Sequence, residues 1–204
     1  MSTDLTSAAL PARFDHLLRV IGSERFLKME SLGNEVPFFI CPYAPQEAVE
    51  MQKLVGQLAR RLRQQGVHVV EINLYDLAVE LLQERGIWEQ VLEVEPTVGK
   101  AEFLDLLQGV LDPETHVIPA IGQRLAGEAC DVFLLTGAGE VFPYIRSHNV
   151  LNNLQSTAKD FPTVLFFPGQ YEQSQAAGAS LRLFGRLPDD KYYRAFNIYH
   201  IEAA

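Results

Sequence analysis

The hydrophobic positions along the chain follow two periodicities, and their alternation predicts the order of the elements. Apolar residues at helical spacing predict amphipathic helices over 10–22, 46–66 and 74–86. Short, nearly continuous apolar runs predict strands over 36–43 and 67–73. In chain order these segments form a helix followed by a β-α-β-α unit, whose strands we expect to be parallel.

The second half of the chain begins with a long helical stretch and then returns to strands. Residues 86–129 contain several helical patterns and no convincing strand, so they predict a helical insertion. The most apolar strands are predicted over 130–137 and 161–169, and such runs are typical of central strands covered on both faces. Residues 170–180 have no periodicity and are interpreted as a polar loop, and 181–201 predict one or two short edge strands.

These patterns predict an α/β fold, a three-layer sandwich around a mainly parallel sheet of four to five strands. The chain has 204 residues, of which 48% are hydrophobic. This is enough to bury one sizeable core and short for two independent ones. We therefore expect a single α/β domain over residues 1–204.

The same composition predicts a cytoplasmic location. No run of about 18 uncharged apolar residues occurs, and the N-terminal segment lacks the basic start and apolar centre of a secretory signal. Both cysteines, Cys41 and Cys130, lie in or beside apolar strand patterns. This placement favours reduced, buried thiols over a disulfide or a metal site.

The net charge of −9 is concentrated in the middle of the chain. Residues 71–128 contain 12 acidic and 3 basic side chains, whereas the segments on either side are nearly balanced. Such a block disfavours direct binding to the phosphates of nucleic acids. A solvated helical face is the favoured interpretation of the block, and a face that docks a partner is the alternative.

The familiar nucleotide and metal motifs are missing from this sequence. A P-loop needs glycines that turn backbone N–H groups toward phosphate, but no glycine lies between Cys41 and Val55, and Lys53 comes too late. The pair Gly99 and Lys100 follows no strand, so it is interpreted as a turn into a helix. The five histidines are 32 to 52 residues apart, which gives no pre-formed zinc site. We expect no cofactor and no metal.

The stretch DVFLLTGAGEVFPYIRSHNVLNNL, residues 131–154, carries a predicted strand through two glycines into a helical pattern. It lacks the third glycine of a dinucleotide fingerprint, and Glu140 would repel a phosphate. Neither Ser nor Cys stands between the glycines as a nucleophile. We expect Gly137 and Gly139 to form a sharp, partly positive-φ turn, with the regular helix starting near Phe142 or later.

A polar cluster follows this turn, namely Arg146, Ser147, His148, Asn149, Asn152 and Asn153. Helix capping and a role toward a ligand or partner explain the cluster equally well. We expect the turn to display Arg146 and His148 above the carboxyl edge of the sheet. The strand predicted after it should end at Phe167. If the two strands pair, Pro168, Gly169 and Tyr171 lie next to the turn.

Together these motifs resemble the B component of BREX phage-exclusion systems. The resemblance is carried by Gly-x-Gly-Glu-x-Phe-Pro, Arg-Ser-His and Leu-Asn-Asn-Leu within 131–154. It continues with Phe-Pro-Gly, Leu-Arg-Leu-Phe and Tyr-Tyr-Arg-Ala-Phe within 162–198, and extends more weakly to the strand FFICPY and its helix.

This resemblance implies a small core protein of a bacterial system that methylates host DNA and blocks replication of unmodified phage DNA. It implies no catalysis of the protein's own. The implied partners are an alkaline-phosphatase-like Z protein first, and then an adenine-specific DNA methyltransferase and a large ATPase. Neither tight direct binding to nucleic acid nor a membrane association is expected.

Two hypotheses from different classes follow. The first is a non-enzymatic assembly subunit with a docking surface formed by Arg146, Ser147, His148, Asn149, Tyr171, Arg182, Arg186, Tyr192, Tyr193 and Arg194. Arginine and tyrosine anchor many interfaces, because they combine apolar area with hydrogen bonding. The second is a degenerate nucleotide- or phosphate-binding enzyme or switch, in which Arg146 and Arg194 converge on a phosphate. The motif analysis favours the first.

Overall fold

The structure, a computed structural model, describes residues 5–30, 37–174, 178–188 and 195–202. Its strands are β1 (Phe38–Tyr43), β2 (Val69–Asn73), β3 (Val132–Thr136), β4 (Thr163–Ser174), β5 (Gly178–Leu183), β6 (Leu187–Pro188) and β7 (Phe196–Asn197). Its α-helices are α1 (Leu10–Ile21), α2 (Glu24–Leu27), α3 (Ala48–Gln64), α4 (Leu74–Glu84), α5 (Trp88–Val94), α6 (Lys100–Val110), α7 (Ile118–Gly127) and α8 (Ser147–Leu154). Short helical turns are η1 (Leu5–Ser7), η2 (Pro45–Glu47), η3 (Pro113–Val117) and η4 (Ile198–His200).

The sheet confirms the predicted fold class. Its parallel part has the order β2-β3-β4-β1-β7, in which β4 pairs with both β3 and β1. The strand β5 then pairs with β4 in the antiparallel sense, and β6 pairs with β5. One or two short edge strands were predicted near the C-terminus, and the described residues form three, β5, β6 and β7, which extend the sheet in two different places.

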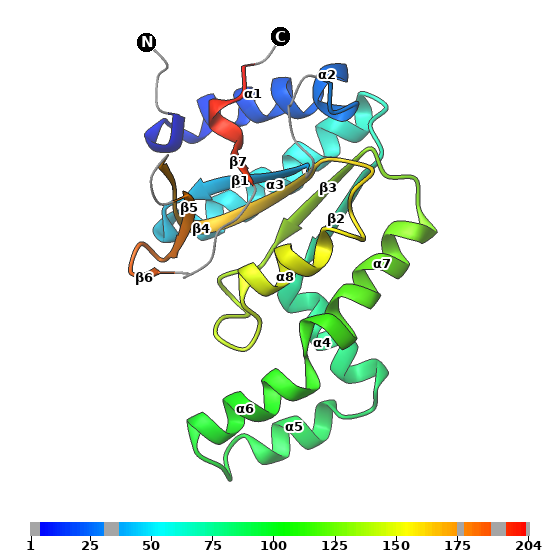
Figure 1. The fold of residues 1–204 in the computed structure, drawn as a ribbon, viewed down its shortest axis with the longest axis vertical. Helices are drawn as coiled ribbons and strands as arrows, with labels where there is room; N and C mark the ends of the chain where they lie inside the picture. The colour runs from blue at the N-terminus through cyan, green and yellow to red at the C-terminus, as the bar shows by residue number, and fades with distance from the viewer. Residues whose placement is uncertain (1–4, 31–36, 175–177, 189–194, 203–204) are drawn as a thin grey trace.

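Successive strand residues point to opposite faces of the sheet, and each face has its own core. On β1, Phe39 and Cys41 pack with α1, α3 and η4. Phe38 and Ile40 point the other way and pack with α4, α7 and α8. Helices thus cover both faces, as Figure 1 shows. This two-sided burial explains why the central strands are apolar at nearly every position.

The predicted helical insertion is confirmed, since α5, α6, η3 and α7 fill the chain between α4 and β3. Two of these helices, α5 and α6, project away from the sheet at the bottom of Figure 1. We call residues 88–110 the helical arm. Its base is fixed to the body by Arg85, whose Nη1 donates a hydrogen bond to the carbonyl of Val110.

Two predictions for the chain after Phe167 were wrong: that the strand ends there, and that residues 170–180 form a polar loop. The strand β4 continues to Ser174, and residues interpreted as a polar loop form a hairpin with β5. One face of this hairpin is buried and the other is solvated. Tyr171 and Leu181 point inward as a cross-strand pair, while Glu172 points outward. The polar outward residues masked the strand pattern in the sequence.

Gly169 is the residue at which β4 passes from the parallel sheet into the hairpin. A Cβ atom at this position would lie 2.1 Å from the carbonyl oxygen of Arg182 on the paired strand. Only a residue without a Cβ atom permits this approach of two backbones.

We therefore expect Gly169→Ala to lower the free energy of unfolding by roughly 2 kcal/mol or more, because backbone atoms must move to relieve the overlap. Urea unfolding followed by circular dichroism measures the change. Gly109→Ala is the matched control, since nothing lies within 4 Å of a Cβ atom there and α6 gains a better helix former. A Gly169→Ala protein as stable as the unsubstituted chain would contradict this account of the hairpin.

Candidate docking surface at the carboxyl edge of the sheet

The carboxyl ends of β2 and β3 are joined by a close contact between their loops. Asn73 ends β2 and caps α4, because its Oδ1 accepts hydrogen bonds from the backbone N–H groups of Tyr75 at 2.8 Å and Asp76 at 3.3 Å. Gly137, the first residue after β3, has φ +79°, and a Cβ atom there would lie 2.3 Å from Asn73 Oδ1. The expected positive φ at Gly137 is confirmed.

Gly139 is needed for space and not for a positive φ. A Cβ atom at Gly139 would lie 2.7 Å from Cγ of Pro168 and 3.1 Å from Cε1 of Phe184. The turn after β3 thus packs against the hairpin, and the prediction that Pro168 lies beside the turn is confirmed. The helix α8 begins at Ser147, which agrees with a start after Phe142.

The expected display of His148 was wrong. Its side chain is buried, with 6% of its surface exposed, and Ser147 is buried beside it. The buried stripe of α8 also includes Val150, Leu151 and Leu154, which follow the spacing of one helix face. Ser147 and His148 lie on this inward stripe, so neither presents its side chain at the surface.

Arg146 and Asn149 flank these buried residues and are half-buried. Arg146 directly precedes the first turn of α8. The carbonyl of Asn149 accepts a hydrogen bond from Nδ2 of Asn153 at 2.8 Å. Asn153 thus bonds back along its own helix, whereas no side chain caps the start of α8, so the capping hypothesis is not supported there.

The remaining predicted residues fall into three groups. Tyr171 is buried, and its hydroxyl donates a hydrogen bond to the carbonyl of Ala195, which attaches the hairpin to the segment before β7. Arg182 and Arg186 are exposed on β5 and on the turn after it. The predicted residues Tyr192, Tyr193 and Arg194 lie outside the described part of the chain.

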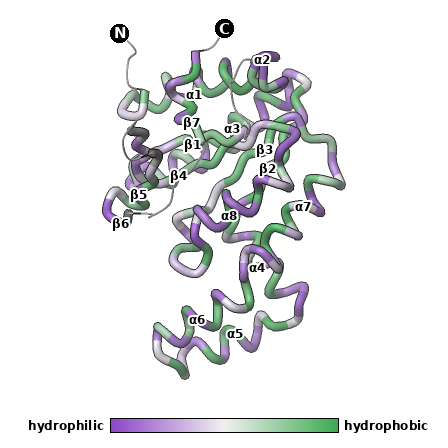
Figure 2. Tube along the Cα trace, in the orientation of Figure 1, coloured by the Kyte–Doolittle hydropathy of each residue, from purple (hydrophilic) through white to green (hydrophobic). Residues whose placement is uncertain are grey.

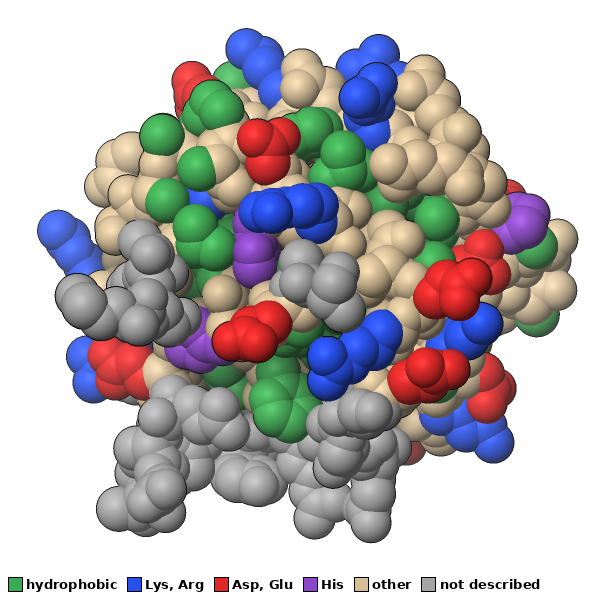
Figure 3. Space-filling view, turned by 90° about the horizontal axis from the view of Figure 1, so that it is seen from above, with side chains coloured by type: hydrophobic (Ala, Val, Ile, Leu, Met, Phe, Trp, Pro, Cys, Tyr) green, Lys and Arg blue, Asp and Glu red, His purple; other side chains and the backbone are tan. Residues whose placement is uncertain are grey.

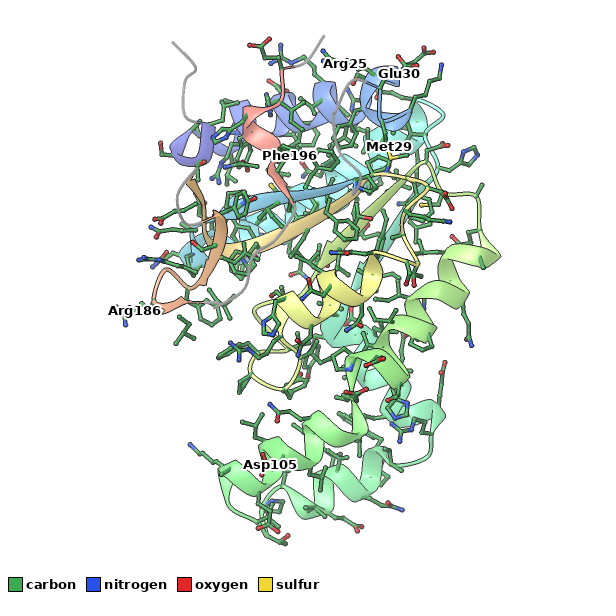
Figure 4. All side chains as sticks on the ribbon, viewed as in Figure 1. Arg25, Met29, Glu30, Asp105, Arg186 and Phe196 are labelled. Carbon is green, nitrogen blue, oxygen red and sulfur yellow. The ribbon has the colours of Figure 1, made fainter. Side chains whose placement is uncertain are left out.

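Sequence reasoning missed two apolar residues at the turn between β5 and β6. Phe184 is 39% exposed and lies in sequence between the two exposed arginines. Leu187 is 41% exposed and directly follows Arg186. We call Arg182, Phe184, Arg186 and Leu187 the edge patch. Arg186 points outward from the end of the hairpin in Figure 4. The signal available in the sequence was LRLFGRL, in which apolar and basic residues alternate along an exposed strand edge.

Two more exposed apolar side chains lie at the same edge of the sheet. Val49 is in the first turn of α3, which follows β1, and Tyr75 is in the first turn of α4, which follows β2. Of the five large hydrophobic residues exposed in the described part of the chain, only Leu92 of α5 lies away from this edge. The carboxyl edge therefore carries four of the five large hydrophobic side chains exposed among the described residues.

The pKa values of two phenols at this edge, Tyr43 and Tyr144, are raised, so both stay neutral at physiological pH. Burial raises the pKa of Tyr144 to about 12, and the neighbouring Tyr75 and Glu140 add to the rise. Burial, followed by the charge of Glu140, also raises the pKa of Tyr43. Neutral hydroxyl groups beside a carboxylate are hydrogen-bond donors, which suits polar contacts with a partner.

The corner after β1 holds a buried polar network and no phosphate loop. The chain passes through Pro45 and η2 into α3, with no glycine to turn N–H groups inward. Arg13 is 1% exposed, and its Nη2 donates to Oε1 of Glu47 at 2.6 Å. Cys41 Sγ donates to the Tyr199 hydroxyl at 3.3 Å. This network attaches α1 and the C-terminal turn η4 to the sheet.

No group of three or more histidine, cysteine, aspartate or glutamate side chains is placed to hold a metal ion in the part of the chain that the structure describes. Likewise, none of the helices described has the length and apolar character needed to cross a membrane.

The fold and its carboxyl edge define a three-layer α/β protein with an elaborated hairpin, and comparison with known proteins gives its family. The family model described as BREX protein BrxB matches residues 70–198. The chain is 34% identical over 190 residues to the BREX protein BrxB of Bacillus cereus (strain H3081.97). The matched residues make up 91% of this chain and 95% of that relative.

A second relative, the BREX protein BrxB of Escherichia coli O9:H4 (strain HS), is 29% identical over 189 residues, which covers 93% of this chain and 91% of the relative. No solved structure matches. The chain therefore belongs to the BrxB family and is a component of a BREX phage-defence system. This confirms the resemblance found in the sequence motifs.

The thiol of Cys41 should be closed to thiol reagents in the native protein. Burial raises the pKa of Cys41 to about 12, against smaller opposing effects of Tyr199 and Arg13, and it raises the pKa of Cys130 to about 11. Since only the thiolate reacts, Cys41 should be modified only after unfolding.

The measurement is the release of thionitrobenzoate from Ellman's reagent at pH 8 by a Cys130→Ser protein, before and after addition of denaturant. We expect no release from the native protein and one equivalent after denaturation. Prompt modification of native Cys130→Ser protein would show that the network around Cys41 is open to solvent.

Proposed function

We propose that this protein is a non-catalytic assembly subunit of its BREX system, and that it binds the alkaline-phosphatase-like Z protein through the edge patch. In this role it supports host DNA methylation and phage restriction by holding other components together. The observation that carries the proposal is the exposure of Phe184 and Leu187 beside Arg182 and Arg186 on one projecting hairpin.

The chemistry of the edge patch is that of a protein interface. Aromatic residues and arginine are enriched at interface centres, where apolar area is buried while the guanidinium group keeps its hydrogen bonds. Phe184 is held in place by two features: its backbone has φ +54°, and its ring packs over Gly139. A side chain that is already ordered loses little conformational entropy on binding.

The space that a phosphate would need after β3 is filled by packed side chains. Pro168 and Phe184 both lie within 3.1 Å of where a Cβ atom of Gly139 would be. This packing supports a structural turn at that corner over an anion site. The half-buried Arg146 and Asn149, at the start of α8, are proposed as the rim of the docking surface, and Tyr193 and Arg194 as further members of it.

Charge reversal at the centre of the edge patch tests the proposal. We expect Arg186→Glu to weaken binding of the Z protein by about 1–4 kcal/mol, roughly 5- to 1,000-fold in Kd, because the partner surface must accept an arginine. Isothermal titration calorimetry with purified proteins measures the change, and phage plating efficiency reports the loss of restriction. The thermal unfolding midpoint should stay the same, because Arg186 is exposed.

Arg25→Glu is the matched control, since Arg25 is also an exposed arginine but lies on α2, well away from Arg186 in Figure 4. It should leave both binding and restriction unchanged. Equal Z-protein affinities for the two charge-reversed proteins would place the docking surface elsewhere. A rise in thermal stability with a nucleotide would support the phosphate-binding alternative instead.

A further inference from the structure

A groove runs between α1 and α3, on the face of the sheet opposite α4 and α8. It consists of two hollows of about 360 and 440 Å³, which adjoin each other because Phe14 and Gln57 line both. One end has apolar walls from Leu10, Phe14 and Leu54, and it is also lined by the exposed side chains of Asp15, Glu50 and Lys53. The other end is basic, with Arg60 and Arg61 exposed at its rim.

The dimensions and chemistry of this groove suit a short amphipathic helix. Its lining extends along α3 from Glu50 to Gln64, which is roughly 20 Å at the helical rise per residue. An apolar stripe on the occupant would enter the apolar end, and acidic side chains would meet the two arginines. Figure 3 looks onto the end of the molecule that carries α1, where basic and apolar side chains lie side by side at the surface.

The helical arm has the complementary chemistry. Between Trp88 and Val110 it contains five acidic residues and one lysine. Apolar and polar residues alternate along α5 and α6 in Figure 2, and no residue of α6 is fully buried. On α5, Glu89, Leu92 and Glu93 share one helix face by their spacing, and Leu92 is 43% exposed.

The arm and the groove of one molecule cannot meet. The arm projects at the bottom of Figure 1, and α1 crosses the top, with the sheet between them. Asp105 of the arm and Arg25 of α2 mark these two ends in Figure 4. A complementary pair of surfaces at opposite ends of one chain is the arrangement that joins identical copies head to tail.

We propose that the helical arm of one copy of this protein docks into the groove between α1 and α3 of a second copy. Leu92 enters the apolar end of the groove, and Glu89 and Glu93 lie against Arg60 and Arg61. The contact goes beyond the proposed binding of the Z protein and uses different residues, because the edge patch lies on the β5–β6 hairpin. Each copy in such an assembly keeps its edge patch exposed to a partner.

Paired charge reversals test this contact by sedimentation velocity across a concentration series. The unsubstituted chain should associate, and less so as salt rises, because the ion pairs are screened. A groove-reversed protein, Arg60→Glu with Arg61→Glu, and an arm-reversed protein, Glu89→Lys with Glu93→Lys, should each associate roughly tenfold or more weakly than the unsubstituted chain.

Mixing the two reversed proteins gives the decisive result. The unchanged acidic arm of the groove-reversed protein then faces the unchanged basic groove of the arm-reversed protein, and the two reversed surfaces also carry opposite charges. The equimolar mixture should therefore associate more tightly than either variant alone. A control with Arg25→Glu and Lys28→Glu, exposed on and beside α2 and outside the groove, should behave as the unsubstituted chain. Circular dichroism on each variant checks that the fold is kept.

Three outcomes would overturn the proposal. The first is an unsubstituted chain that stays monomeric at every concentration and salt. The second is unchanged association of either reversed protein. The third is a mixture of folded reversed proteins that remains monomeric, because only a direct contact between arm and groove predicts recovery.

Discussion

The strand β4 is the constraint on which the rest of the structure depends. Its first residues pair with β1 on one side and β3 on the other, so it lies at the centre of the parallel sheet with both faces buried. Its last residues leave that sheet and pair with β5 in the opposite sense. A single strand therefore belongs to the core at one end and presents a hairpin at the other, and Gly169 permits the change because it has no Cβ atom.

The position of β4 also determines which residues are available at the carboxyl edge. Because β3 pairs with β4, the turn after β3 is pressed against Pro168 and Phe184, and the space above Gly139 is filled. The same packing directs α8 onto the sheet and buries Ser147 and His148. In many α/β proteins this edge is an open crevice for a ligand. Here a hairpin closes part of it and carries arginine, phenylalanine and leucine to the surface instead.

The buried Arg13 shows how the opposite layer is held. Its side chain is 1% exposed and is compensated by Glu47, which is itself partly exposed. Removal of one partner from such a pair leaves an uncompensated charge, so the pair maintains the approach of α1 to the β1 corner. The groove between α1 and α3 is therefore bounded by helices whose relative position is set by the core, which makes it a defined surface. The base of the arm has an exposed contact instead, the hydrogen bond from Arg85 to the carbonyl of Val110.

The sequence by itself determined the alternation of strands and helices, the two-sided burial of the central strands, the helical insertion and the turn at Gly137. These features follow from local periodicity and from residue types with narrow conformational preferences, so a short segment of sequence is enough to predict each of them. Only the tertiary structure decided that β4 continues past Phe167, that His148 points inward and that Phe184 and Leu187 remain exposed. Burial of a side chain depends on which distant segment covers it, and neither periodicity nor composition predicts which segment that is. The same reason separates the acidic arm from the basic groove: their charges are visible in the sequence, but their placement at opposite ends of the molecule follows from how the layers pack.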